Sequence, residues 1–422
     1  MTEANKFFPD KILIILSFLL AFFCLVRAWN YGQASRGIDF YQFWAVGQEI
    51  SQEKKINIYS DDIRRSLGSE FLEKAQDSKS LRFILAADYR KTLQTYSTPF
   101  LYSLFGIFSS KDYDRAYTIY QFICMACMVF TILMLSKLLR LTFVFSMLFL
   151  VFLTSCFEPY FSDLRVANVN QIQLGLLVLF LWFQSRYDWK THNFLGGIVL
   201  GSLIMFKPNL MFLILMLSIS WLINRRFKKM ILAYTGIAIS VIVAVIFSSI
   251  IFGSMQCWFD WLKAGISIAP GITTVGLGNY AFSRLIMDCF GMDLTKYLIT
   301  VLVSITALFI WLGSQKELSE NRRNPNSDLF NDILIVSAGC LIYLLSAPLV
   351  WLHYYMLAVP SAIFMLRPAG YFKLQVNRRS TIISRTLAIF AMIMLSLAPA
   401  HALFGWKSAY YTASTTVIRS TR

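Results

Sequence analysis

The sequence predicts an all-α protein, specifically a polytopic helical membrane protein. Of its 422 residues, 57% are hydrophobic and only 15% are charged, whereas about a quarter of a soluble domain is charged. The apolar residues form blocks long enough to cross a bilayer, which takes roughly 20 residues per helix. We expect these blocks to be helices because a backbone exposed to lipid must satisfy its own hydrogen bonds.

Apolar run length and flanking charge predict about eleven membrane-spanning helices in a single integral membrane domain, residues 1–422. The first apolar block follows Lys6 and Lys11. No small-residue cleavage site comes after it, so we expect a retained span rather than a signal peptide. Lys207-Pro208 separates two short blocks, which predicts a helical hairpin because proline ends or kinks a helix. The expected spans are 11–28, 115–137, 141–157, 171–185, 194–206, 209–223, 230–252, 297–313, 331–347, 353–367 and 382–404.

The topology depends on whether segment 96–110 spans the membrane or re-enters it. If this segment does not cross, the basic loops, including NRRFKK at 224–229, all lie on the side of the N-terminus, and the positive-inside rule makes that side the cytoplasm. The loops 29–114 and 253–296 are then outside. Stretch 48–95 mixes charged and apolar residues, which predicts short amphipathic helices on the membrane surface. We therefore expect a multi-pass protein of the inner or plasma membrane with its functional face on the periplasmic or extracellular side.

The net charge of +16 fits this arrangement better than nucleic-acid binding, because the cations occur in short runs between apolar blocks. The sequence has seven cysteines. Cys124 and Cys127 form a C-x-x-C inside an apolar block without a second pair, which favours core packing. Cys257 and Cys289 are both expected outside, where an oxidising compartment permits but does not require a disulfide.

The predicted topology collects most of the unusual polar residues at the outer ends of spans. Ionisable groups at membrane depth are costly and usually face a cavity or a partner. Their convergence on one face therefore predicts a polar functional site there. These residues are Asp39, Glu158, Asp163, Arg165, Asn168, Asn170, Lys207, Asn279, Arg284 and His353.

Four of these residues have side chains suited to catalysis or phosphate binding, and each also has a structural alternative. Asp39, in GIDFYQFW, suits a general base, but it also suits the N-cap of the following helix. Lys207 and Arg165 suit phosphate binding, but a lysine can snorkel to the interface and Arg165 can pair with Asp163. His353 is one of three histidines, and a lone histidine is more often a satisfied polar residue than a ligand.

Several of these stretches match motifs of a known family in their order and spacing. Asp39-Phe40-Tyr41, with Ile58-Tyr59 after it, resembles an outer-loop D-F-x-x-Y, and the sequence ANVN after Arg165 sits where the family often has G-Q-V-N. FLGGIVLGSLIMFKPNLMFLILML, followed by RRFKK, is similar to L-A-G-x-x-L-G-x-x-x-x-x-K-x-x-P. Gly278-Asn279 resembles G-N-Q-S, and the stretch from Ser346 to His353-Tyr354 resembles S-P-x-S-W-x-H.

These motifs, from the first span to about residue 366, resemble the polyprenyl-phosphate-sugar-dependent glycosyltransferases of the C-type fold. The particular group is glycosyltransferase family 87, with bacterial α-mannosyltransferases and arabinofuranosyltransferases. Asn168 stands in place of the usual Gln, Tyr280 and Ala281 replace Gln and Ser, and Val350 stands where Ser is common. These departures leave the donor sugar open.

The resemblance implies that a monosaccharide, mannose or another hexose or pentose, moves from a polyprenyl-phosphate donor to a lipid- or polysaccharide-linked acceptor with inversion. It implies Asp39 as the general base, with Lys207 and Arg165 neutralising the phosphate. His353 would hydrogen-bond the phosphate or the acceptor, and Arg284 would also bind the donor. The residues implied to orient sugar hydroxyls are Asn168, Asn170 and Asn279.

The expected partners are the sugar donor, a glycolipid or glycan acceptor and membrane lipid, without nucleic acid. No cofactor is expected, because the sequence has no metal-spaced cluster, Walker A loop or dinucleotide fingerprint, although a divalent metal stays open. A transporter or flippase of a lipid-linked sugar is the alternative, since it would also have broken helices and intramembrane polar groups. Against it, the polar residues lie at one end of the spans and we find no inverted repeat. A structural scaffold would leave those residues unexplained.

Overall fold

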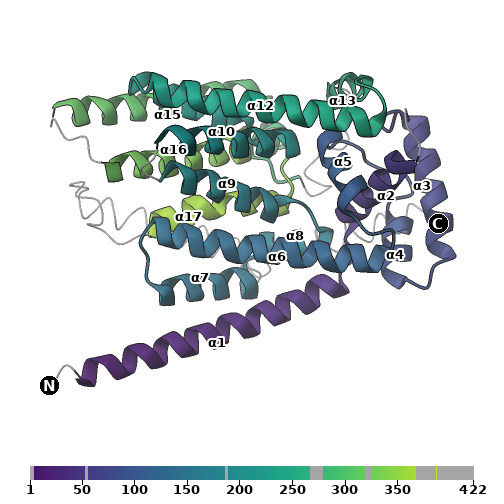
Figure 1. The fold of residues 1–422 in the computed structure, drawn as a ribbon, viewed down its shortest axis with the longest axis horizontal. Coiled ribbons are helices and arrows are strands. Elements are labelled where there is room, and N and C mark those ends of the chain that lie inside the picture. The colour runs from purple at the N-terminus through teal and green to yellow at the C-terminus, as the bar shows by residue number, and fades with distance from the viewer. Residues whose placement is uncertain are drawn as a thin grey trace. The chain divides into compact units, whose positions relative to one another are not determined.

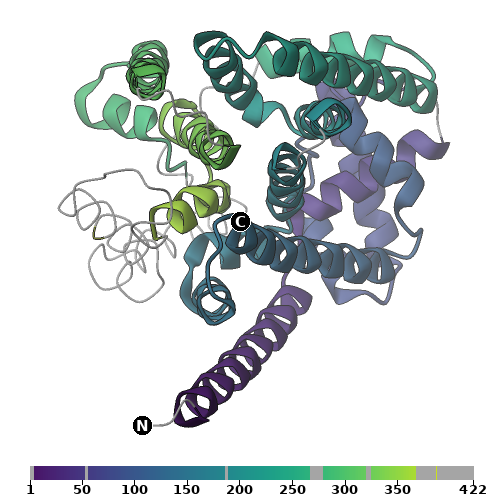
Figure 2. The ribbon, with the colours of Figure 1, turned by 60° about the vertical axis from the view of Figure 1, so that its left-hand side comes forward.

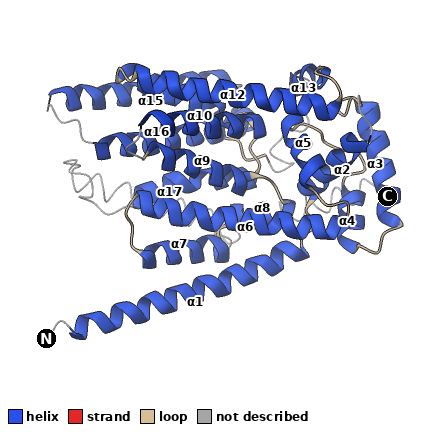
Figure 3. Cartoon of the chain, viewed as in Figure 1, coloured by secondary structure: helices blue, strands red, loops and turns tan. Residues whose placement is uncertain are grey.

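The structure is a computed structural model that describes residues 4–52, 56–185, 189–266, 279–319, 325–366 and Thr386. Helices and their connecting loops make up these residues, and no strand occurs among them (Figure 3). The all-α prediction is therefore confirmed. The last predicted span, 382–404, lies outside the described residues apart from Thr386, and so does the stretch PGITTVGLG of the second outer loop.

Among the described residues, four helices are long and apolar enough to cross a membrane. A fifth candidate is the pair α8 (Glu158–Val166) and α9 (Asn170–Gln184), which is bent by 115°. At 1.5 Å per residue, a helix of 26 residues reaches about 39 Å, more than the roughly 30 Å of bilayer hydrocarbon. The chain is therefore a helical membrane protein, while the count of about eleven spans stays a prediction. The four helices are α1 (Ala4–Ala34) over Lys11–Ala34, α6 (Tyr113–Leu138), α12 (Phe227–Phe252) and α15 (Thr295–Ser319) over Thr295–Leu312.

The exposed surface of these helices is apolar, as expected for a lipid-facing protein. Phe23 on α1 is 67% exposed, Ile250 on α12 is 63% exposed and Phe309 on α15 is 68% exposed. Such continuous apolar exposure is rare on soluble monomers and marks contact with a membrane or a partner. Cys257 and Cys289 are free thiols in the structure, so they do not form the disulfide that the sequence permits.

The described chain divides into two compact units. The first unit comprises Met1–Asn30, Val129–Asp163 and Gly271–Arg422. Within it, α15 packs on α16, and α16 packs on η4 and α17 (Figure 2). Besides α15, most of α1 and parts of α6 and α8, its helices are α7 (Phe143–Cys156), α14 (Phe282–Phe290), α16 (Pro325–Ser346), η4 (Leu352–Ala358) and α17 (Val359–Leu366).

The second unit comprises Tyr31–Met128 and Leu164–Pro270. Within it, α2 packs on α5, and α10 packs on both α9 and α12 (Figure 1). Within the stretch 48–95, residues 61–76 and 81–89 form the short helices α3 and α4, while their place on the membrane surface stays a prediction. Besides α9, α12 and parts of α6 and α8, the unit's helices are α2 (Ile38–Gln52), α3 (Asp61–Gln76), α4 (Leu81–Tyr89), α5 (Pro99–Phe108), α10 (Trp189–Phe206), η1 (Pro208–Leu210), α11 (Met211–Ile223) and α13 (Gln256–Ile266).

The ambiguous segment 96–110 contains only the ten-residue helix α5. Ten residues rise about 15 Å, half the hydrocarbon thickness, so α5 is too short to span alone. Its N-cap Thr98 accepts a hydrogen bond from Leu101 N and donates through Oγ1 to the carbonyl oxygen of Met205 at 2.6 Å. The start of α5 is thereby tied to the end of α10, where the chain reaches Lys207.

Small residues bring α10 and α12 close together. A Cβ on Gly197 would lie 2.1 Å from the carbonyl oxygen of Ala233, and one on Gly236 would lie 2.2 Å from that of Phe194. Close backbone approach through small residues is a common way to pack helices in membranes. Because α10 is held along its length, the position where it ends, before Lys207-Pro208, is also fixed.

Candidate active site

The start of α2 positions Asp39, and a glycine fixes that start. Gly37 has a φ of +64°, its N–H donates to the carbonyl oxygen of Arg165 at 3.1 Å, and its own carbonyl accepts from Tyr41 N at 2.8 Å. A Cβ there would lie 2.2 Å from a ring carbon of Tyr117, so glycine is required. Gly37 therefore occupies the N-cap position, and the alternative interpretation of Asp39 as the N-cap is wrong.

Aromatic packing holds the first turn of α2 in place. Phe40, the neighbour of Asp39, is fully buried, and its ring centroid lies 4.9 Å from that of Tyr120 and 5.2 Å from that of Tyr117. Both tyrosines are on α6. Such aromatic pairs stabilise by about 0.5–1.5 kcal/mol beyond their buried area. The Asp39 backbone is consequently rigid.

Three side chains donate hydrogen bonds to the carboxylate of Asp39. Asn168 Nδ2 lies 2.6 Å from Oδ2, Arg90 Nη2 lies 3.1 Å from Oδ1, and Gln42 Nε2 lies 3.5 Å from Oδ1. The side chains of Asp39 and Arg90 are only 13% and 14% exposed, so this is a mostly buried ion pair. Hydrogen bonds to charged groups are stronger than neutral ones, and these orient the carboxylate firmly.

Asn168 connects Asp39 to Lys207. Its Oδ1 accepts from Lys207 Nζ at 3.0 Å while its Nδ2 donates to Asp39. Because an ammonium only donates and a carboxylate only accepts, the two neighbours fix the orientation of this amide. Lys207 Nζ also donates to Oδ1 of the fully buried Asn170 at 3.4 Å. The structure thus brings Asp39, Asn168, Asn170 and Lys207 together.

A sharp turn between α8 and α9 presents the two asparagines. Ala167 has a φ of +56°, a left-handed conformation that costs a residue with a Cβ about 1–2 kcal/mol. One turn further along α9, the buried Gln173 donates through Nε2 to Asn209 Oδ1 at 2.8 Å, and Asn209 follows Pro208. Polar contacts therefore continue from the turn to the helix break after Lys207. Strained residues of this kind cluster at functional sites.

Of the other four candidates, Asn279, His353 and Arg284 lie in the first unit and Arg165 lies in the second, and their predicted roles stay predictions. Asn279 is fully buried and donates to the carbonyl oxygen of Pro348 at 2.7 Å, while its Oδ1 accepts from Val350 N at 2.9 Å. These contacts hold two loops together. His353 is buried in η4, and Arg284 is half-buried in α14. Arg165 is half-buried in α8, and its carbonyl receives the Gly37 hydrogen bond described above.

Sequence reasoning missed Arg90 and Gln42. Gln42 lies one helical turn after Asp39, and residues three apart on a helix share a face. This spacing could have identified Gln42 from the sequence as a neighbour of Asp39. Arg90 follows α4 by one residue in a loop rich in charges, and nothing in its neighbourhood distinguishes it from a solvated cation. In the described part of the chain, no group of three or more His, Cys, Asp or Glu side chains could hold a metal ion.

The lipid-facing helices and the buried chain of polar groups define an integral membrane protein with a carboxylate and a lysine joined through an amide. Residues 95–328, more than half of the chain, match the model of glycosyltransferase family 87. The chain therefore belongs to glycosyltransferase family 87, which confirms the resemblance drawn from its motifs. The matched region includes Asn168, Asn170 and Lys207 but begins after Asp39. No curated protein and no solved structure matches the chain.

Proposed function

We propose that the protein transfers a monosaccharide from a polyprenyl-phosphate donor to a glycolipid or glycan acceptor with inversion of the anomeric centre. The observation that supports this most is the joining of Asp39 and Lys207 through Asn168 in a helical protein that is 57% hydrophobic. A base and a phosphate-binding cation are the two groups that such a transfer needs. Family membership supplies the glycosyltransferase activity.

In the proposed reaction, the Asp39 carboxylate takes the proton of the acceptor hydroxyl. The hydroxyl oxygen bonds to the anomeric carbon, and the bond from that carbon to the phosphate oxygen breaks on the opposite face of the sugar. Lys207 stabilises the charge that develops on the departing polyprenyl phosphate. Arg90 and Asn168 keep the carboxylate in place, and Asn170 keeps the ammonium in place.

We further propose the C-type fold with about eleven spans, in the inner or plasma membrane, with Asp39 on the periplasmic or extracellular side. The short α5 supports this topology, because a non-crossing segment 96–110 leaves the basic loops on the cytoplasmic side. The exposed native thiol of Cys289 offers a test. A membrane-impermeant maleimide should label Cys289 in intact cells. The exposed Lys228→Cys, in a Cys289→Ser background, should label only after permeabilisation. The reverse pattern would overturn the topology.

Incubation of the purified full-length protein with a panel of polyprenyl-phosphate sugars and membrane glycolipids tests the activity. The expected result is loss of one donor, with appearance of free polyprenyl phosphate and a glycosylated acceptor. A flippase would move a donor between leaflets without consuming it. If no member of the panel is consumed while a nucleotide sugar is, the donor class is wrong.

A further inference from the structure

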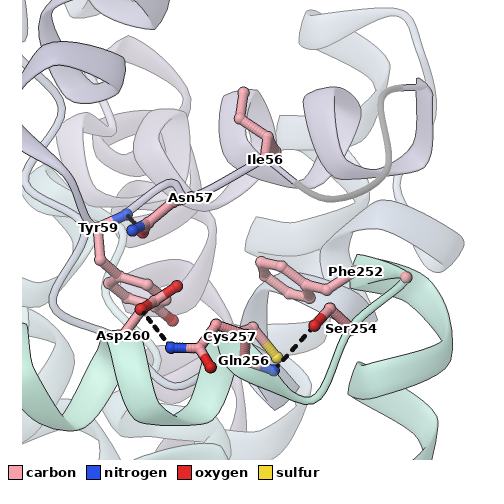
Figure 4. A pocket seen from close by; sticks show the side chains of 9 residues that line it. Ile56, Asn57, Tyr59, Phe252, Ser254, Gln256, Cys257 and Asp260 are labelled. Atoms are coloured by element: carbon pink, nitrogen blue, oxygen red, sulfur yellow. Dashed lines mark hydrogen bonds between the residues drawn. The ribbon is translucent and has the colours of Figure 1, made fainter.

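A pocket of about 600 Å³ lies in the second unit, between the chain that follows α2 and the junction of α12 and α13 (Figure 4). Ligand pockets in proteins usually measure roughly 300–1,000 Å³, so it is large enough for a sugar. Asp39 and Lys207 do not line it. The lining residues are Ile56, Asn57, Tyr59, Phe252, Gly253, Ser254, Gln256, Cys257 and Asp260.

The chemistry of the pocket suits an uncharged, hydroxyl-rich ligand. Asp260 provides a carboxylate that accepts a hydrogen bond from Gln256 Nε2 at 3.1 Å, and neither lysine nor arginine is among the lining residues that the structure describes. Burial raises the pKa of the Tyr59 hydroxyl well above its ordinary value and the pKa of the Cys257 thiol to about 12. Both stay neutral at neutral pH. A phosphate would meet the negative charge of Asp260, whereas sugar hydroxyls can donate to it.

A five-residue segment, Gln94–Thr98, connects this pocket to the candidate active site. At one end, the N–H of Gln94 donates to Gln42 Oε1 at 2.6 Å, and Gln42 in turn contacts Asp39. In the middle, the Tyr59 hydroxyl of the pocket donates to the carbonyl oxygen of Ser97 at 3.0 Å. At the other end, Thr98 Oγ1 donates a hydrogen bond to the carbonyl oxygen of Met205, which lies at the end of α10 just before Lys207.

The same segment also holds the helix that bears Asp260. Trp261 Nε1 on α13 donates to the carbonyl oxygen of Tyr96 at 3.2 Å, and Thr95 Oγ1 donates to that of Ile58 at 2.7 Å. Ile58 lies between the lining residues Asn57 and Tyr59. Both walls of the pocket are therefore bonded to the segment whose ends contact the active-site elements. The position of the pocket relative to Asp39 is thus fixed by hydrogen bonds.

We propose that this pocket is a subsite for an uncharged sugar of the acceptor glycan, separate from the hydroxyl that reacts. The inference rests on the proposed function. The donor phosphate needs a cation, which Lys207 supplies, whereas the charged group among the described lining residues of the pocket is the carboxylate of Asp260. The carboxylate of Asp260 and the amides of Asn57 and Gln256 offer acceptors and donors for hydroxyls, and the Tyr59 and Phe252 rings offer apolar surface.

Saturation-transfer NMR with methyl α-mannoside and methyl β-glucoside tests the pocket directly, using the full-length protein in nanodiscs. At least one glycoside should bind the parent protein, and inorganic phosphate at the same concentration should not displace it. Asp260→Asn should weaken binding about tenfold, because a hydrogen bond to a charged group is replaced by a neutral one. The control Asp62→Asn removes an exposed carboxylate on α3 and should change nothing. Asn57→Ala provides a second variant should Asp260→Asn fail to fold.

Binding of neither glycoside, or equal binding by the parent and both pocket variants, would overturn the proposal. Transfer kinetics then distinguish a failure of the pocket proposal from a failure of the proposed function. Asp260→Asn should raise the KM for the acceptor about tenfold while leaving the KM for the donor unchanged. If the parent protein consumes no polyprenyl-phosphate sugar, the proposed function fails while glycoside binding still tests the pocket. A rise in the donor KM alone would assign the pocket to the donor and refute the acceptor subsite.

Discussion

Replacing Asp39 with asparagine would remove both the proposed general base and the partner of a mostly buried arginine. Two unit charges 3.1 Å apart attract by about 5 kcal/mol at an effective dielectric constant of about 20. Desolvation offsets much of this attraction, yet removing one partner of a buried pair costs about 3–5 kcal/mol. Because the side chains of Asp39 and Arg90 keep 13% and 14% exposure, we expect the lower end, about 3 kcal/mol.

A cycle of three variants separates the structural loss from the chemical one. Asp39→Asn leaves the Arg90 charge without its carboxylate, and Arg90→Met leaves the carboxylate with its two amide donors, Asn168 and Gln42. The double variant removes both charges and should recover about 2 kcal/mol relative to the sum of the single losses. Transfer should fall about 10²–10⁴-fold in Asp39→Asn and in the double variant. Arg90→Met should keep measurable transfer because the base remains.

The measurements are the thermal unfolding midpoint in nanodiscs and the initial rate of sugar transfer from the preferred donor. Restored stability without restored transfer would identify Asp39 as the base. If the double variant transfers sugar within a few-fold of the parent, Asp39 has only a structural role. In that case Glu158 and Asp163, the other two carboxylates predicted on the same face, would be tested next.

Three further predictions concern single substitutions in the second unit. Lys207→Met should weaken binding of the polyprenyl-phosphate donor about 10–100-fold in a donor titration, since a hydrogen bond to a charged group contributes about 1.5–3 kcal/mol; unchanged affinity would indicate a lysine that snorkels. Gly197→Ala should lower the unfolding midpoint, because its Cβ would overlap the Ala233 carbonyl and overpacking costs about 1–3 kcal/mol. The control Gly265→Ala, with no atom within 4 Å of its Cβ, should be neutral or stabilising. Ala167→Gly should increase the free energy of unfolding by about 0.5 kcal/mol and so raise the unfolding midpoint slightly, because glycine relieves the strain of the left-handed φ by more than it costs in chain entropy. A lower midpoint would show that the turn is not strained.

The helices and the break at Lys207 were predictable because their causes are local. The apolar blocks 115–137 and 230–252 predict α6 and α12, which have 26 residues each, by length alone, and proline at 208 explains why α10 ends at Phe206. The short α9 was harder to interpret. Its 15 residues are too few to cross the bilayer alone, and α9 reaches the length of a span only together with α8. The 115° bend between these two helices cannot be recognised from the hydropathy of the sequence.

The active site was predictable only in part, because its contacts join residues far apart in the sequence. Asp39 and Lys207 attract notice as charged residues beside apolar blocks, and their motifs follow a family pattern. Arg90 attracts none, since it lies 51 residues from Asp39 among other charges. The pocket near Asp260 could not be predicted from the sequence either. Its walls come from the chain after α2 and from α13, and only the folded segment Gln94–Thr98 brings them together.

The amide of Asn168 lets a carboxylate and an ammonium occupy one site while each also bonds the same neutral side chain. A direct ion pair between Asp39 and Lys207 would hold both in mutual attraction, and a phosphate would compete with the carboxylate for the lysine. With the amide between them, Asp39 pairs with Arg90 and not with Lys207, and Asp39 and Lys207 each keep a hydrogen bond to Asn168, at 2.6 Å and 3.0 Å. Asn168 stands where the family often has the longer Gln, so the side chain at this position sets the separation of the proposed base from the proposed phosphate-binding cation. In the inverting transfer that we propose, this separation would match the distance between the attacking hydroxyl and the departing phosphate on opposite faces of the sugar.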